Sequence, residues 1–137
     1  MLKHLRARTP ILFAFFVVFL GIVASEWLHL YETLPHFDKA MHVLGGLSAA
    51  WVGLALLQDE ITHLPFWKQV LVFVSFATLA GVLWEIAEFL ANSSRDSLPL
   101  LYRYFHGGDM ADTIGDLVAD IIGAIGLSLW ALKKERS

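Results

Sequence analysis

The chain has no cysteine, few charged residues and no basic stripe, and each shortage excludes a class of function. Without cysteine it can form no disulfide and perform no thiolate chemistry. Charged residues are only 17% of the 137 residues and the net charge is −3, so the basic footprint of a nucleic-acid-binding protein is missing. Hydrophobic residues reach 57% and mean hydropathy is +0.61, which is too apolar for a soluble domain of this size.

Four long apolar runs stand out instead. A helix crosses the hydrocarbon of a bilayer in about 20 residues, and runs of this length lie at roughly 10–30, 39–58, 67–91 and 112–132. The first run also has the basic start and the small-residue site near Ala24 that are typical of a signal peptide. It continues into EWLHLY, however, and we interpret it as an uncleaved span. The sequence therefore predicts an all-α membrane protein, with one four-helix transmembrane domain over residues 1–137.

The distribution of lysine and arginine predicts how the domain is oriented. With the N-terminus inside, the outer segments hold three basic residues (Lys39, Arg95, Arg103) and the cytoplasmic segments hold seven (Lys3, Arg6, Arg8, Lys68, Lys133, Lys134, Arg136). Cytoplasmic loops carry the excess of such residues, so both termini are predicted to be cytoplasmic, in the cell (inner or plasma) membrane. The outer segment 92–111 is the longest connection, and its LPLLYRYF stretch suits a surface-lying, re-entrant or lid-like piece.

Ionisable residues gather at the outer end of every predicted span. Because successive spans run in opposite directions, the ends of spans one and three meet the starts of spans two and four. The groups are Glu26 and His29, then Asp38, Lys39 and His42, then Glu85 and Glu88, and finally Asp112, Asp116 and Asp120. A charged side chain deep in hydrocarbon costs about 2.5–3.5 kcal/mol. The cluster is therefore predicted to keep some carboxyl groups protonated or to bind a cation.

The fourth span carries its acids on a face of small residues. At 100° per residue, Asp112, Asp116 and Asp120 lie beside Gly115, Ala119 and Gly123, while the opposite arc is aliphatic and is expected to face lipid (Ile114, Leu117, Val118, Ile121, Ile122, Ile125). The second span places His42 on a similar face, with Gly45, Gly46, Ala49 and Gly53, and Gly81 precedes Glu85 by one turn. Small residues let helices approach closely in lipid, so these faces are predicted to meet.

Carboxylates with one or two imidazoles suit Mg²⁺, Mn²⁺ or Ca²⁺, and also Zn²⁺ where few ligands are used. The predicted metal ligands are Asp38, His42, Glu85, Glu88, Asp116 and Asp120, and the predicted catalytic residues are Asp38, His42, Glu85 and Asp116. Plainer interpretations remain open: Asp38 and Asp112 as helix N-caps, and Glu26 with His29 as an interfacial pair on one helix side. His106 could reach the site from the outer segment, and Arg95 and Arg103 could contact an anionic head group.

The motifs Asp38-Lys39-x-x-His42, Glu85-x-x-Glu88-Phe89 and Asp116-x-x-x-Asp120-x-x-Gly123 resemble those of VanZ-like membrane proteins. WEIAEF together with DTIGDLVADIIGA is also similar to the YjdF-type family of small inner-membrane proteins. Glu88 and Asp120 depart from the VanZ-like pattern, which usually has Gln and Asn there and an Arg shortly before the fourth-span acid. VanZ-like proteins are linked to glycopeptide-antibiotic resistance, so the resemblance implies a role in the cell envelope.

Three hypotheses of different classes follow. The first is an envelope protein whose acidic site binds a divalent cation together with a lipid-linked or phosphate-bearing ligand, as a metal-dependent hydrolase or transferase if it is an enzyme. The second is a proton- or cation-coupled carrier, working as a homo-oligomer because four short spans leave one copy little room for a pathway. The third is a structural protein that acts through partners, in which the acids and His42 only fix helix register.

Overall fold

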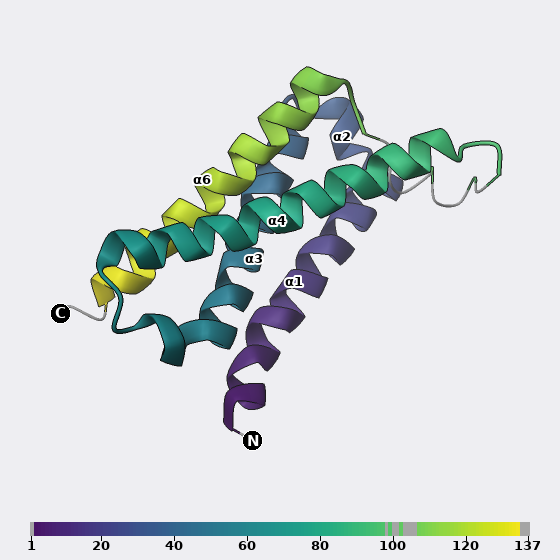
Figure 1. Cartoon of the computed structure of the whole chain (residues 1–137). Helices are drawn as coiled ribbons and strands as arrows, with labels where there is room; N and C mark the ends of the chain where they lie inside the picture. Colours follow the sequence, from purple (N-terminus) through teal and green to yellow (C-terminus); the bar gives the residue numbers. More distant parts are fainter. Residues whose placement is uncertain (1, 98, 100–101, 103–106, 135–137) are drawn as a thin grey trace.

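The computed structural model describes residues 2–97, 99, 102 and 107–134, and every regular element within them is a helix (Figure 1). Four helices are long: α1 (Leu2–Glu26), α3 (Phe37–Ile61), α4 (Phe66–Ser93) and α6 (Met110–Lys134); α2 (Leu30–Thr33) is a single turn. Each long helix contains a stretch apolar enough to cross a membrane (Ala7–Glu26, Phe37–Ile61, Phe66–Ser93, Met110–Ala131). The prediction of an all-α protein with four spans is confirmed.

The first helix ends earlier than the sequence suggested. α1 stops at Glu26, and His29 and His36, on either side of α2, have left-handed backbones with φ of 50° and 63°. Non-glycine residues seldom adopt this conformation, although histidine tolerates it better than most. The prediction that Glu26 and His29 lie on one side of a helix is therefore wrong, because α1 ends between them and the chain turns at His29.

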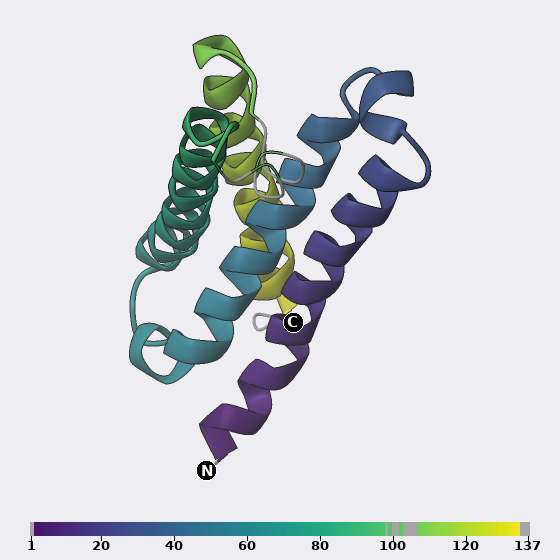
Figure 2. The ribbon, with the colours of Figure 1, turned by 90° about the vertical axis from the view of Figure 1, so that its right-hand side faces the viewer.

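α3 is the central helix and packs on each of the other long helices (Figure 2). Its contact with α6 is the most extensive, and it depends on glycines, which have no side chain to keep the two helices apart. A Cβ added at Gly46 would collide with the backbone of Asp120, and one added at Gly123 would collide with the carbonyl of Val43. The predicted meeting of the two small-residue faces is confirmed, and it buries Asp116 and Asp120 between the helices.

The apolar core lies toward the end of the bundle away from the acids, where α3, α4 and α6 meet. It consists of Ala50, Ile61, Phe73, Ala77, Ala124 and Leu127. On α6, the predicted lipid-facing residues Ile114, Val118, Ile122 and Ile125 are exposed, while Ala119 and Gly123 are buried. The helical-wheel prediction for this span is thus confirmed for these residues, and the exposed arc is the face that a membrane protein presents to lipid.

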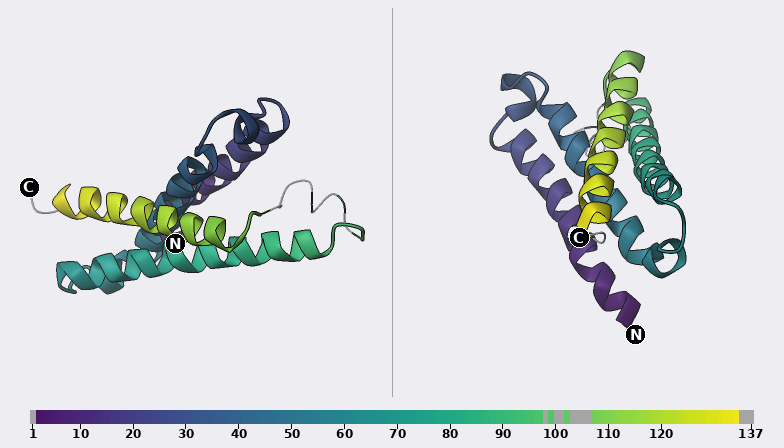
Figure 3. Two further views of the ribbon diagram at one scale, coloured as in Figure 1. Left: turned by 90° about the horizontal axis from the view of Figure 1, so that it is seen from above. Right: turned by 90° about the vertical axis from the view of Figure 1, so that its left-hand side faces the viewer.

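α1 stands apart from the α4–α6 pair. It packs along α3 and touches α2, and the described residues show no comparable contact between α1 and either α4 or α6. Figures 2 and 3 show α1 and α4 on opposite sides of α3, so that the bundle has two arms joined at α3. This separation matters for the site, because the acidic cluster lies where the arms meet.

Candidate functional site

Lys39 lies among three carboxylates at the end of the bundle where α1 and α4 end and α3 and α6 begin, here called the acidic end. Its Nζ atom lies 2.5 Å from Asp112, 2.6 Å from Asp116 and 3.3 Å from Asp38. Asp112 and Asp116 are one turn apart on α6, so a single lysine from α3 reaches both of them. The sequence indicated that Lys39 was a nearby base, and the structure makes it the ion-pair partner of all three acids.

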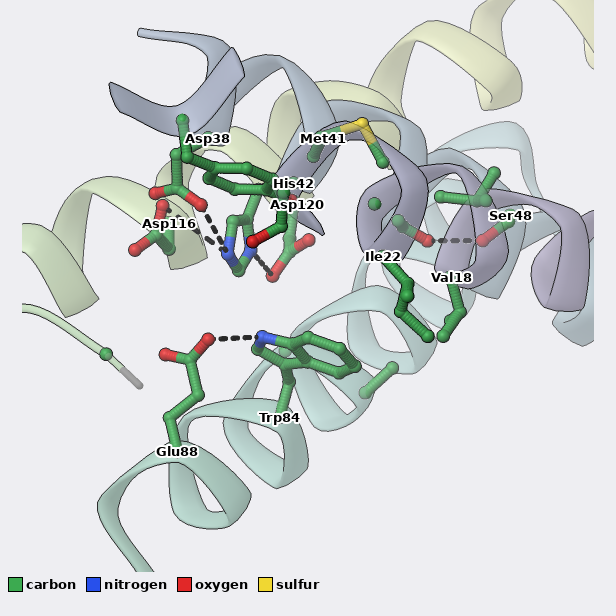
Figure 4. A pocket seen from close by; sticks show the side chains of 18 of the residues that line it. Val18, Ile22, Asp38, Met41, His42, Ser48, Trp84, Glu88, Asp116 and Asp120 are labelled. Carbon is green, nitrogen blue, oxygen red and sulfur yellow. Dashed lines mark hydrogen bonds and ion pairs between the residues drawn. The ribbon is translucent and has the colours of Figure 1, made fainter. Parts of the chain in front are cut away.

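His42 lies one turn further along α3 and faces three acids of its own (Figure 4). Its Nε2 atom is 3.9 Å from Asp38 and 3.5 Å from Asp116, and its Nδ1 atom is 3.5 Å from Asp120. The side chains of Asp116 and Asp120 are almost completely buried, whereas that of Asp38 is more than one third exposed. The imidazole therefore lies between a solvent-accessible carboxylate and two buried ones.

The ligand atoms of Asp38, His42 and Asp116 are close enough together for a small cation to be tested against them. One ligand atom from each residue can be chosen so that all three lie within 4.8 Å of one another. Ligands at about 2.0–2.2 Å from a tetrahedral or octahedral ion are separated by roughly 3–4 Å, and the two His42 distances are of this size. Oxygen and nitrogen donors suit Mg²⁺, Mn²⁺ or Zn²⁺. The side chains present therefore fit such an ion, with Asp120 adjoining them through His42.

The two glutamates of α4 have different surroundings. Glu88 faces the Asp38–His42–Asp116 group across a gap, and its carboxylate accepts a 2.7 Å hydrogen bond from Nε1 of Trp84 (Figure 4). Glu85 accepts a 2.7 Å hydrogen bond from Thr113, while its Oε1 atom is buried and has no hydrogen-bond partner among the residues that the structure describes. Glu85 lies toward α6 and not among the residues that line the cavity, so the structure separates it from the other predicted ligands.

Neither of the predicted aspartate caps is a cap. Asp109 directly precedes α6 and caps it, because its side chain accepts hydrogen bonds from the backbone N–H groups of Ala111 and Asp112 at 2.9 and 3.0 Å. His36 precedes α3, with Asp38 inside the first turn. Asp38 and Asp112 are both left in first turns, where the helix dipole favours a negative charge, and their side chains are free to pair with Lys39. The cap interpretation is therefore wrong for both residues, and each of them pairs with Lys39 instead.

A cavity of about 560 Å³ opens between the two arms. Its polar wall includes Asp38, His42, Glu88, Asp112, Asp116 and Asp120, together with Ser25, His29, Tyr31, Glu32, Ser48 and Trp84. Burial, with a smaller contribution from the negative charge of Asp38, raises the pKa of Tyr31 to about 12, so its phenol remains a hydrogen-bond donor at neutral pH. The sequence analysis did not identify Tyr31 and Trp84 as residues of the site.

Only part of the outer segment, residues 92–111, belongs to the described structure. His106, proposed from the sequence as a residue that reaches the site, and Arg103, proposed as a contact to a head group, lie outside the described residues. Arg95 is described, and its guanidinium lies 4.8 Å from the ring centre of Tyr102. The end of the segment does approach the site, because a Cβ added at Gly107 would meet the side chain of Glu88. The cavity is thus bordered by Gly107 on the side of α4.

Comparison with known proteins extends the sequence analysis. An uncharacterized protein from Thermotoga maritima is 30% identical over 122 residues, which cover 86% of this chain and 59% of that protein. The chain thus spans about three fifths of the length of this relative. No solved structure matches. The model of the family described as predicted membrane protein DUF2238 matches residues 4–136, in agreement with the YjdF-type resemblance. The chain is a multi-pass membrane protein and belongs to the DUF2238 family.

Proposed function

We propose that the chain binds a divalent cation at Asp38, His42 and Asp116 and, through it, the phosphate of a lipid-linked ligand. The observation that carries the proposal is the grouping of these three ligand atoms within 4.8 Å on the wall of a cavity between the helices. The VanZ-like resemblance supports a role in the cell envelope, where such ligands occur.

The charges around the cavity favour the binding of a cation over the binding of an anion. Asp38, Asp112, Asp116 and Asp120 outnumber the bases Lys39 and His42, and Glu88 adds a further carboxylate opposite them. A phosphate alone would be repelled by this surplus, whereas a bound divalent ion reverses the local charge and attracts it. Lys39 shares Asp116 with the proposed ion and remains within reach of Asp112, so it can stay in the site as a second positive group.

Hydrolysis or transfer of the phosphate is the reaction class that this arrangement supports. A bound divalent ion polarises the phosphoryl oxygens and lowers the pKa of coordinated water. Asp38, His42 and Asp116 would hold the ion, and Asp120 would orient His42 through its Nδ1 atom. Glu88, facing the group from α4, is the carboxylate placed to accept a proton from water. Glu85 is left out of these roles because it does not line the cavity.

A second candidate is a proton- or cation-coupled carrier, and one observation favours it. Asp116 and Asp120 are buried one turn apart on α6 with His42 3.5 Å from each, which is the kind of acid–imidazole chain that carries protons through membrane proteins. Reconstituted protein that moves a cation along an imposed pH gradient, with loss of the flux in Asp120→Asn, would favour this candidate over the first.

Metal content measured by mass spectrometry on detergent-purified protein tests the proposal. Wild type should carry a divalent metal, and Asp116→Asn should carry much less, since one of three ligands becomes neutral. Asp96→Asn is the matched control, because Asp96 is exposed in the outer segment, and it should keep the wild-type content. Equal, near-zero occupancy in all three proteins would refute the cation site.

A further inference from the structure

The cavity lies in a wedge between α1 and α4, whose described residues make no extensive contact with each other. Residues of both helices line it, while α1 packs mainly on α3 and α4 packs on both α3 and α6. Figure 4 shows Val18 and Ile22 of α1 beside Trp84 of α4, with the acidic group further along the same space. One cavity thus extends from the polar group to the side of the bundle.

The polarity of the lining changes along the wedge. The acidic end supplies the carboxylates and His42, whereas the remainder is lined by small and apolar residues (Ala14, Val17, Val18, Ile22, Met41, Ala49, Ala80). Val18 and Ile22 are each 41% exposed, and Ala80 is also exposed, so this part of the wall is open to the outside of the bundle. In a membrane, the outside at this position is lipid, and the wedge therefore opens sideways into the bilayer.

The length of the wedge matches one leaflet. On α1 the lining runs from Ala14 to Ser25, and on α3 from Asp38 to Ala49. Eleven residues of helix span about 16 Å at 1.5 Å per residue. Half of a hydrocarbon core of about 30 Å is about 15 Å. The cavity thus extends from the surface at the acidic end to about the middle of the membrane.

From this geometry we propose that the ligand is a phosphate-bearing lipid of the leaflet at the acidic end, which enters sideways between α1 and α4. One hydrocarbon chain lies along Val18, Ile22 and Met41, and the head group lies beside Asp38, His42 and Asp116. The choice of a phosphate head group rests on the proposed function. The place of the chain rests only on the shape and polarity of the wedge.

The lining of the cavity favours a lipid over a helix of a second copy. The cavity, of about 560 Å³, carries charged groups at one end and apolar side chains along the rest. A lipid has a head group and a hydrocarbon chain in the same order. Since a lipid chain moves from one apolar environment into another, burial adds little affinity. The head group must therefore supply most of the binding, and the wedge determines which chains fit.

Photo-crosslinking tests the proposal on the intact chain. The probe is phosphatidylglycerol with a diazirine in one acyl chain, carried in phosphatidylcholine vesicles, and peptide mass spectrometry locates the crosslinks. They should concentrate on the wedge-lining peptides of α1 and α4. Val18→Trp fills the wedge and should reduce them about tenfold, as expected for an overpacked site. Ala80→Leu, from the opposite wall, should act in the same direction. Val118→Trp is the matched control, because Val118 is exposed on α6 outside the cavity, and should change nothing.

Metal content is measured on the same samples to separate this inference from the proposed function. Crosslinks lost in Val18→Trp, with metal retained, support the lipid site. Localised crosslinks on a wild type that holds no metal support the lipid site and overturn the cation proposal. Crosslinks spread evenly over the exposed faces, unchanged in Val18→Trp, overturn the lipid site. Chain-to-chain crosslinks at the wedge that disappear in Val18→Trp also overturn it, because a second copy would then be the occupant.

Discussion

Replacing Lys39 with methionine removes the positive charge that Asp38, Asp112 and Asp116 share while keeping most of the side-chain volume. Removing one partner of a buried ion pair costs about 3–5 kcal/mol, and Asp116 is buried. Asp38 and Asp112 are more than one third exposed, so each of their pairs contributes at most about 1 kcal/mol. Because Lys39 is itself 30% exposed, we expect the lower end of the range, a loss of about 3 kcal/mol in the free energy of unfolding.

A divalent cation should restore most of that loss. A ligand present at one hundred times its Kd stabilises the folded state by about 2.7 kcal/mol, and the three carboxylates of Lys39→Met lack their competing lysine. The assay is unfolding of detergent-purified protein by sodium dodecyl sulfate, followed by tryptophan fluorescence, with chelator or with Mg²⁺, Mn²⁺, Ca²⁺ or Zn²⁺ in turn. In chelator the variant should be the less stable protein, and in the preferred cation its stability should approach that of wild type in chelator.

Lys68→Met is the control for Lys39→Met. Lys68 is exposed at the other end of the bundle, with its Nζ atom 5.4 Å from the ring centre of Trp67. Its removal should cost about 0.5–1 kcal/mol, with or without metal. If Lys39→Met were no less stable than this control, the ion pairs would not hold α3 to α6. If it lost about 3 kcal/mol and no cation restored any of it, the cation site would be refuted.

Three further changes test the packing, the ligand set and the orientation. Gly46→Ala should destabilise the protein by about 1–3 kcal/mol or more, because the added Cβ collides with the backbone of Asp120. Gly126→Ala, whose added Cβ meets no described atom within 4 Å, should be neutral or slightly stabilising in the same unfolding assay. Glu85→Gln should retain wild-type metal content, and a loss as large as that of an Asp116 variant would return this residue to the ligand set. Since the chain has no cysteine, single cysteines introduced at Ser97 and Thr62 report topology directly. An impermeant maleimide should label the cysteine at position 97 in intact cells and the cysteine at position 62 only after permeabilisation. The reverse labelling pattern would invert the predicted orientation.

The features that the sequence predicted are those set by local periodicity. Apolar runs predict the four spans, and the spacing of Gly123 and Asp120 on α6 places small and acidic residues on one helix face. The contact of Gly123 with α3 then follows, because close approach in lipid requires small residues. The convergence of Asp38, His42 and Asp116 could also be predicted, since antiparallel helices bring their polar ends to one side of the membrane.

The features that it did not predict depend on how the helices rotate against one another or on single backbone angles. Nothing in the residues around Lys39 shows that it reaches α6, and nothing around Glu85 shows that it turns toward Thr113 and away from the cavity. The stop of α1 before His29 depends on a left-handed residue that is not glycine, for which the sequence carries no signal. Asp109 is preferred to Asp112 as the cap because it directly precedes α6, a boundary that sequence patterns locate only to within a few residues.

The dependence of α1 on a single long neighbour has a consequence for how any occupant could leave. α3, α4 and α6 contact one another in all three pairings, whereas α1 packs on α3 alone among the long helices as far as they are described. A tilt of α1 would enlarge the wedge at the cost of its contacts with α3 and α2, while Asp38, Glu88, Asp112, Asp116 and Asp120, which come from α3, α4 and α6, would keep their mutual positions. Exchange of a bulky molecule with the bilayer could then proceed by movement of one wall, with the polar group at the acidic end undisturbed.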